Sequence, residues 1–150
     1  MRFLIIGCGS IGSRHLKNIK NLGHDVSGCE EDKKRAKKVS RAYGVKVFDN
    51  LDEALYQDYD GAFICTPTSL HLPLALRLAK KGIHLFIEKP LAHNLEGIKT
   101  LSEIVNRKRL TTLVACNTRF LPSLKFAKRL IDAGKIGKVL SVKMECGFYL

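Results

Sequence analysis

The sequence predicts an α/β fold with a doubly wound parallel sheet flanked by helices. Short apolar segments alternate with amphipathic segments of helical spacing along most of the chain. The first apolar segment is followed by glycines in the pattern G-x-G-x-x-G, and the second ends on an acidic residue, Glu30. Because strand and helix alternate, we expect right-handed crossovers between parallel strands.

The predicted strands are short apolar runs bounded by turn residues. They cover residues 3–6, 25–30, 45–48, 60–65, 83–88 and 111–116. Helices are predicted between them at residues 11–22, 32–43, 49–57 and 69–81, and from Asn94 or a neighbour to about residue 105. Asn50 is a predicted N-cap. Gly23, Gly44 and Gly82 suit the position that closes a helix.

The C-terminal part of the chain departs from this alternation. Residues 122–133 are predicted as an amphipathic helix ended by Gly134, and residues 137–150 alternate like a strand with one exposed face. We therefore expect a helix and an orphan strand that follow the alternating part of the chain. Such a strand needs a partner, so we expect it to pair with another subunit, fold back irregularly or belong to a longer protein.

The composition is that of an ordinary globular domain. The chain has 150 residues, of which 45% are hydrophobic and 27% are charged. No apolar run approaches the roughly 20 residues that a membrane span needs. The run at residues 3–6 is too short for the apolar core of a signal peptide. We therefore expect a cytoplasmic protein without a membrane segment.

Cysteine spacing and charge indicate which partners to expect. The five cysteines are scattered and lack any C-x-x-C spacing, which predicts neither a disulfide framework nor a metal site. The formal net charge of +12 favours anionic partners. Because the basic residues are not interleaved with aromatic ones, nucleic-acid binding is the weaker hypothesis. A solvated helix face that attracts phosphates is the stronger one.

The glycine pattern suits the phosphates of a dinucleotide. Gly7 permits the tight turn after the strand, Gly9 lets the backbone approach a pyrophosphate, and Gly12 lets the helix pack closely on the strand. The N-terminus of the following helix offers N–H groups and a partial positive charge.

Glu30 strengthens this interpretation. It lies about 20 residues beyond the glycines, where an acidic side chain accepts hydrogen bonds from the adenine-ribose hydroxyls. Its charge would repel a 2′-phosphate, which favours NAD over NADP. The neighbouring Lys33, Lys34 and Arg35 leave NADP open, because a nearby basic residue can accommodate that phosphate.

The segment at residues 83–90, Ile-His-Leu-Phe-Ile-Glu-Lys-Pro, reads as a buried strand that stops at proline. It therefore delivers Glu88 and Lys89 to the carboxyl edge of the sheet, where open α/β sheets bind their ligands. The pair is a candidate for chemistry. The alternative is an ordinary solvated charge pair at a strand end.

Taken in order, these motifs resemble those of the Gfo/Idh/MocA family, the glucose-fructose oxidoreductase and inositol dehydrogenase type. The resemblance covers essentially the whole chain. It rests on the glycine turn, Glu30, Thr66-Pro67, His71 and Glu88-Lys89-Pro90, of which the last triplet is the most specific. Residues 116–120, Cys-Asn-Thr-Arg-Phe, are similar to a second short motif of the family. The resemblance implies a Rossmann domain at residues 1–118. It also implies that residues 119–150 are the crossover helix and first strand of an incomplete C-terminal α+β domain of the family.

The resemblance also implies roles for individual residues. The chain would bind NAD, or NADP, for hydride transfer to or from a sugar, cyclitol or polyol-type substrate. The residues implied to hold the adenosine and pyrophosphate are Gly7, Gly9, Ser10, Ile11, Gly12 and Glu30. Those implied to line the rest of the cofactor are Thr66, Pro67, Thr68, His71, Glu88 and Asn117. Lys89 is implied as the catalytic residue, stabilising the reacting oxygen and relaying its proton.

The family's second acid/base lies in its C-terminal half and has no counterpart in this sequence. We therefore expect cofactor binding more firmly than turnover by this chain alone. The alternative is a non-catalytic NAD-binding module that dimerises through its C-terminal strand. Arg14 and His15 on the first helix either face the phosphates or face water, and His84 is expected to be an ordinary strand residue.

Overall fold

The computed structural model describes residues 1–145 and residue 147. The chain forms two compact units, Met1–Ala115 and Cys116–Leu150. The sequence placed the boundary between domains after residue 118. Among the described residues, no helix is both long enough and apolar enough to cross a membrane.

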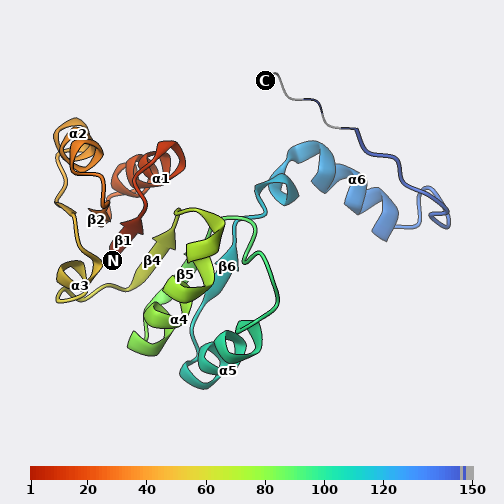
Figure 1. Cartoon of the computed structure of the whole chain (residues 1–150). Helices are drawn as coiled ribbons and strands as arrows, with labels where there is room; N and C mark the ends of the chain where they lie inside the picture. The colour runs from red at the N-terminus through yellow and green to blue at the C-terminus, as the bar shows by residue number, and fades with distance from the viewer. Residues whose placement is uncertain (146, 148–150) are drawn as a thin grey trace. The chain divides into compact units, whose positions relative to one another are not determined.

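The first unit is built on one parallel sheet (Figure 1). Its strands are β1 Arg2–Ile6, β2 Asp25–Cys29, β3 Val47–Phe48, β4 Gly61–Ile64, β5 His84–Ile87 and β6 Thr112–Val114. They lie in the order β3-β2-β1-β4-β5-β6, and all neighbours pair in parallel. All the predicted strands of this unit are confirmed, most of them with shorter bounds. The order reverses between β1 and β4, and such a switch point is where open α/β sheets bind ligands.

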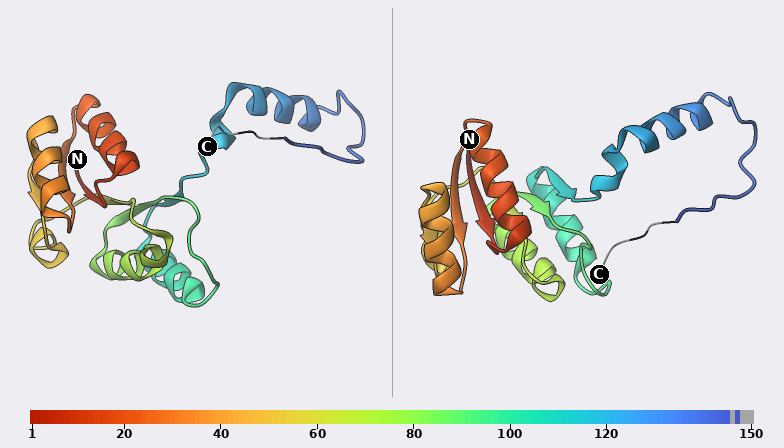
Figure 2. Two further views of the ribbon diagram at one scale, coloured as in Figure 1. Left: turned by 45° about the horizontal axis from the view of Figure 1, so that its top comes forward. Right: turned by 90° about the horizontal axis from the view of Figure 1, so that it is seen from above.

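Helices cover both faces of the sheet (Figures 1 and 2). They are α1 Ser10–Asn21, α2 Lys33–Tyr43, α3 Leu51–Ala54, the 3₁₀ turn η1 Thr68–Leu70, α4 His71–Lys81 and α5 Ile98–Lys108. Alternate residues of β1 enter opposite cores: Ile5 packs with Leu16 of α1, whereas Leu4 packs in the cluster that contains Leu78 of α4. This period-two division confirms the doubly wound arrangement.

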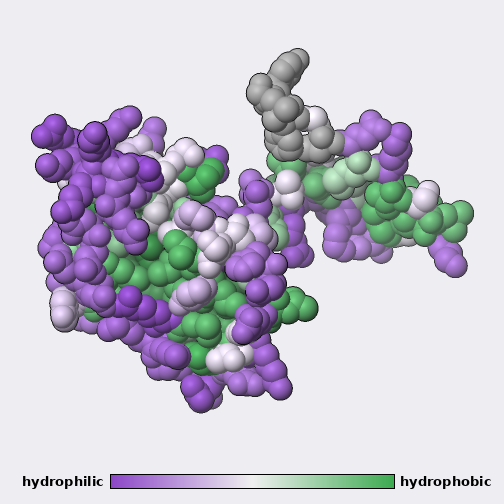
Figure 3. All heavy atoms as spheres, viewed as in Figure 1, coloured by the Kyte–Doolittle hydropathy of each residue, from purple (hydrophilic) through white to green (hydrophobic). Residues whose placement is uncertain are grey.

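The helix ends follow local chemistry, and Asn50, Gly44 and Gly82 act as the sequence predicts. The Asp32 carboxylate accepts backbone N–H groups from the first turn of α2 at 2.9 and 3.0 Å. Asn50 caps α3 in the same way at 2.7 Å. Gly44 and Gly82 close α2 and α4 with φ of 61° and 85°. The basic residues of α2 are exposed, and Figure 3 shows a hydrophilic surface over this helix.

The helix predicted to start near Asn94 begins later. α5 starts at Ile98, behind Gly97, whose φ of 80° interrupts helical backbone. Asn94 instead accepts the N–H of Glu96 at 3.1 Å in a local turn, and Leu95 is 85% exposed. Apolar spacing alone favoured a longer helix, but the side-chain bond of Asn94 offers the backbone a competing conformation.

The second unit contains the 3₁₀ turn η2 Asn117–Phe120 and the helix α6 Pro122–Asp132, which confirms the predicted helix. The orphan strand predicted at residues 137–150 is wrong for residues 137–145 and 147, which have no regular secondary structure. Residues 146 and 148–150 lie outside the described residues. A strand is defined by hydrogen bonds to a neighbouring strand, and no described segment pairs with this one. Alternation of polar and apolar residues is therefore not sufficient for this segment to form a strand. Dimerisation through this segment stays a prediction.

Candidate functional site

The predicted site residues of the first unit gather at the carboxyl edge of the sheet. Because β1, β2, β4 and β5 are parallel, the loops that follow them meet at the same edge. In sheet order, β2 presents Glu30, β1 the glycine turn, β4 Thr66 and β5 Glu88. The candidate site therefore extends across the switch point between β1 and β4, which suits a long ligand such as a dinucleotide.

The turn after β1 has no room for side chains at two of its glycines. Gly7 has φ of 85°, and a Cβ there would lie 2.8 Å from the carbonyl oxygen of Cys65. A Cβ on Gly12 would lie 1.9 Å from the carbonyl oxygen of Gly7, so α1 packs directly on the turn. Gly9 differs, because a Cβ there would meet nothing within 4 Å. The bare backbone of Gly9 thus borders open space, as close approach of a pyrophosphate requires.

The N-terminus of α1 is prepared for an anion. Gly9 is the N-cap, and no side chain in the described part of the chain caps the helix. The first backbone bond of the helix runs from the N–H of Ser13 to the carbonyl of Gly9, at 2.9 Å. The N–H groups of Ser10, Ile11 and Gly12 are therefore free of intrahelical partners. With no acidic residue in the first turn, the positive end of the helix fits a phosphate.

Glu30 lies at the end of β2 and is only 7% exposed. Its Oε2 accepts the N–H of Cys8 at 2.9 Å and the Arg35 guanidinium at 3.2 Å, and its Oε1 accepts the N–H of Asp32 at 3.1 Å. A carboxylate has about four acceptor positions, so capacity remains for a ribose hydroxyl. The carboxylate is thus fixed beside the glycine turn, in the position that the sequence predicts.

His71 and Thr66 organise the loops after β4 and β5. His71 is 1% exposed, with Nδ1 2.7 Å from the carbonyl oxygen of Pro90 and Nε2 2.8 Å from that of Thr66. The buried ring therefore links the two loops and does not line the surface of the site. The hydroxyl of Thr66 is buried and makes no hydrogen bond to any described residue. Pro67 is exposed and Thr68 is partly exposed.

Glu88 and Lys89 follow β5 directly. The N–H of Glu88 donates to the carbonyl of Ile64 at 2.9 Å, which fixes its backbone beside β4. Its carboxylate Oε1 lies 2.8 Å from Nε2 of His15 on α1. Lys89 is exposed, and it forms no ion pair within the described residues. The Lys89–Pro90 peptide bond is cis.

Asn117 is the one predicted site residue that lies in the second unit. It begins η2 and its side chain is exposed. A role beside the nicotinamide stays a prediction for this residue.

The thiols near the site are protonated at neutral pH. Burial, and then the charge of Glu30, raises the pKa of Cys8 to about 12. Burial, and then Glu88, raises the pKa of Cys65 to about 12. Burial, and then Glu31, raises the pKa of Cys29 to about 11. These groups therefore act as small apolar residues and not as nucleophiles.

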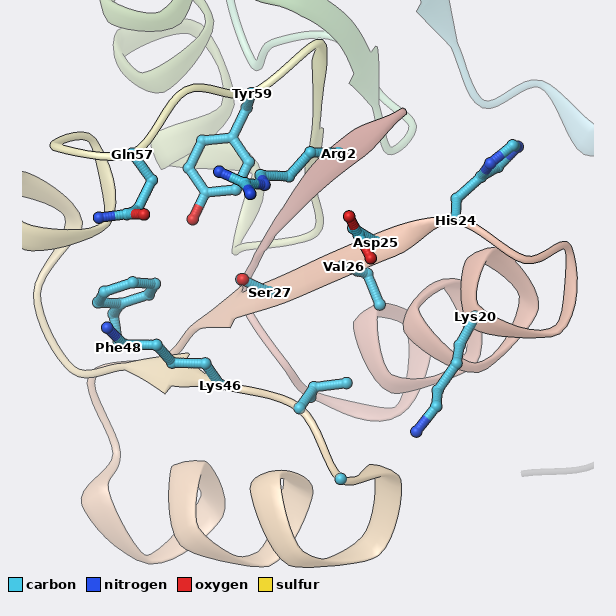
Figure 4. A pocket seen from close by; sticks show the side chains of 12 residues that line it. Arg2, Lys20, His24, Asp25, Val26, Ser27, Lys46, Phe48, Gln57 and Tyr59 are labelled. Atoms are coloured by element: carbon cyan, nitrogen blue, oxygen red, sulfur yellow. The ribbon is translucent and has the colours of Figure 1, made fainter.

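A cavity of about 430 Å³ lies elsewhere, at the amino edge of the sheet (Figure 4). Arg2 of β1 and Asp25 of β2 line it together with Lys20, Lys46 and Tyr59. None of the predicted site residues contributes to its lining. The cavity is therefore separate from the carboxyl-edge site.

The sequence did not predict the partners of two residues at the site, His15 and Arg35. His15 was left between phosphate contact and solvent, and the structure pairs it with Glu88. Arg35 was considered for a 2′-phosphate, and the structure pairs it with Glu30. The pairing of His15 could have been anticipated from β5. Residues alternate along a strand, so His84, Phe86 and Glu88 point to the face that is covered by α1, the helix that carries His15.

Comparisons with known proteins show the family and the fold of this chain. The family described as "Oxidoreductase family, NAD-binding Rossmann fold" (GFO_IDH_MocA) matches residues 1–116. A scyllo-inositol 2-dehydrogenase (NAD(+)) of Bacillus subtilis (strain 168) is 35% identical over 95% of this chain and 43% of its own length. An inositol 2-dehydrogenase of Rhizobium meliloti (strain 1021) is 32% identical over 93% of this chain and 43% of its own length.

Solved structures show the same fold. The scyllo-inositol dehydrogenase from Lactobacillus casei, crystallised with NAD(H) and scyllo-inositol, has a TM-score of 0.84 and 27% identity over 91% of this chain and 42% of its own. The WlbA dehydrogenase from Bordetella pertussis, in complex with NADH and UDP-GlcNAcA, has a TM-score of 0.84 and 27% identity over 91% of this chain and 43% of its own. This chain thus spans less than half the length of the relatives it matches. The family match covers most of the chain and its glycine turn, so the protein belongs to the Gfo/Idh/MocA oxidoreductase family, and its first unit is the NAD-binding Rossmann domain of that family.

Proposed function

We propose that this chain provides the cofactor-binding part of an NAD-dependent dehydrogenase that acts in the cytoplasm on a sugar, a cyclitol or a related polyol. One observation carries the proposal. Glu30, the glycine turn, Thr66 and Glu88 occupy consecutive strands along the carboxyl edge, in the order β2-β1-β4-β5. Relatives named as inositol dehydrogenases support the substrate class.

Each group along this edge has a role in holding the cofactor. Glu30 accepts a hydroxyl of the adenine ribose, and the free N–H groups at the start of α1 bind the pyrophosphate. The loop of Thr66, Pro67 and Thr68 covers the middle of the ligand. Glu88 accepts hydroxyls of the nicotinamide ribose. The cofactor held by these residues would supply the hydride acceptor or donor for a substrate carbon.

Lys89 is the residue proposed for polar catalysis. Its ammonium is exposed beside Glu88 and is not neutralised by an ion pair with any described residue. An ammonium that contacts the substrate hydroxyl stabilises alkoxide character as the proton leaves. Asn117 is proposed to contact the nicotinamide. His71 is proposed to hold the loops after β4 and β5 together, because its ring is buried between them.

NADH titration tests cofactor binding directly. The fluorescence of the reduced nicotinamide should change in a saturable way as the chain is added, with ADP competing. NADPH should bind more weakly because Glu30 repels its 2′-phosphate. About 1 mM is the upper end of ordinary cofactor and substrate affinities. Absence of saturable binding at this NADH concentration would contradict the proposal.

A turnover assay separates the enzyme from the non-catalytic alternative. The purified chain is given NAD with scyllo-inositol, myo-inositol or glucose, and NADH formation is followed by absorbance. A rate that Lys89→Ala abolishes while NADH affinity is retained supports the catalytic role of Lys89. NADH binding without turnover, together with a concentration-dependent dimer in sedimentation, identifies an NAD-binding module.

A further inference from the structure

His15 lies on a platform of two aromatic rings. Phe63 of β4 and Phe86 of β5 are register partners, and their rings stack with centroids 4.5 Å apart. The imidazole of His15 rests against both, at 5.4 Å from Phe63 and 5.0 Å from Phe86. Contacts on two strands leave this ring little rotational freedom, so its nitrogens are held in fixed directions.

Strand alternation brings Glu88 to the same place. Leu85 and Ile87 of β5 enter the core beneath α4, so Phe86 and Glu88 face α1. Nε2 of His15 lies 2.8 Å from Oε1 of Glu88, and the two side chains are only 17% and 19% exposed. An ionised carboxylate can only accept hydrogen bonds, so Nε2 carries the proton and donates it.

This contact leaves one carboxylate oxygen available. The Glu88 backbone is fixed through its N–H to Ile64, and Oε1 is engaged by His15. Oε2 makes no hydrogen bond to any described residue. A carboxylate held at one oxygen presents the other in a defined direction, which lowers the ordering cost of binding a ligand hydroxyl.

We propose that His15 is a positioning residue for the nicotinamide half of the cofactor, holding Glu88 so that its free oxygen meets the ribose hydroxyls. The inference rests on the proposed function, because Glu88 is assigned to that ribose there. His15 acts through Glu88, so its effect is confined to ligands that reach β5. ADP ends at the pyrophosphate and does not extend to Glu88.

The experiment compares NADH and ADP affinity across variants. His15→Phe keeps a ring on the aromatic platform and removes the donor, whereas His15→Gln keeps an N–H donor. We expect His15→Phe to raise the Kd for NADH about ten-fold, in line with one hydrogen bond to a charged group, and to leave the Kd for ADP within about two-fold. His15→Gln should restore most of the NADH affinity. Glu88→Gln should lose a similar factor, with no further loss in the double variant.

His24→Phe is the matched control. His24 also lies beside an aromatic ring, 5.7 Å from Phe3, but it precedes β2 at the opposite edge. Thermal melts confirm that each variant folds. If the wild-type chain binds neither ligand, the proposed function fails. If the wild type binds both but His15→Phe binds NADH normally, or loses NADH and ADP equally, the positioning role is overturned and His15 only packs.

Discussion

The backbone N–H of Cys8 donates a 2.9 Å hydrogen bond to the carboxylate of Glu30, joining the glycine turn to the end of the neighbouring strand. Cys8 is 1% exposed, so this N–H has no access to solvent. Glu30 therefore serves the fold, because it satisfies a buried donor of the glycine turn. The role that we propose for it in cofactor binding is additional to this one.

Replacing Glu30 separates these two roles. Glu30→Ala leaves the Cys8 N–H unpaired, so we expect the free energy of unfolding to fall by about 1–3 kcal/mol. Glu30→Gln keeps a carbonyl acceptor and should lose less. Both should weaken NADH binding and narrow its advantage over NADPH, because the charge that repels a 2′-phosphate is gone. Urea denaturation and fluorescence titration measure the two effects. Equal stability of the two variants would contradict the role of Glu30 in holding the turn.

Replacing Gly9 or Gly12 with Ala should weaken NADH binding in both cases but should affect stability differently. Ala at Gly9 meets no atom within 4 Å and the φ of −64° suits any residue, so Gly9→Ala should fold normally and lose NADH affinity. Ala at Gly12 would lie 1.9 Å from the Gly7 carbonyl oxygen, so Gly12→Ala should lose stability as well as binding. Thermal melts beside NADH titration distinguish them. Normal NADH affinity in Gly9→Ala would place the pyrophosphate elsewhere.

Replacing His71 should lower both the stability of the fold and the affinity for the cofactor. His71→Phe removes the ring nitrogens that lie 2.7 Å from the Pro90 carbonyl and 2.8 Å from the Thr66 carbonyl. We expect a loss of about 1–3 kcal/mol in unfolding free energy, as for a lost buried hydrogen bond, and weaker NADH binding because both loops border the site. His93→Phe, at an exposed position, is the control and should change neither. Unchanged urea midpoints in His71→Phe would show that the ring does not hold the loops.

We expect a thiol reagent to label the cysteines of the folded chain selectively. Their raised pKa leaves Cys8, Cys29 and Cys65 almost wholly protonated at about pH 8, and the thiolate is the reactive form. Brief treatment of the folded chain with iodoacetamide should therefore label the exposed Cys116 and spare these three. Peptide mass mapping reads the pattern, and urea-unfolded chain is the positive control. Rapid labelling of Cys8 in the folded state would contradict its burial.

The same thiols predict loss of stability in alkali. Their folded-state pKa lies at about 11 to 12, above the ordinary value of 9.0, so the folded state holds these protons more tightly than the unfolded state. Their contribution is complete below about pH 9 and is lost as the pH rises toward 12. Urea midpoints measured up the pH scale should decline more steeply in the wild type than in a chain with Ala at all three positions.

The sequence by itself determined the fold class, the strands of the first unit and most helix ends. These depend on local causes: period-two and helical spacing of apolar residues, side-chain caps such as Asn50, and glycines such as Gly44 and Gly82 at left-handed positions. It also indicated Glu30 and Glu88, because residues that follow parallel strands must meet at one edge.

Only the tertiary structure decided which groups touch. The pairing of His15 with Glu88 joins residues 73 positions apart, and it depends on how α1 crosses β4 and β5, which no local pattern specifies. The burial of His71 beneath two loops is likewise a product of packing. Residues 137–145 show the converse, since their alternation predicted a strand that no described segment completes. Helices and turns make their hydrogen bonds between residues close in sequence, so local sequence predicts them. A strand forms only where another strand pairs with it, and a binding site forms only where residues distant in sequence meet.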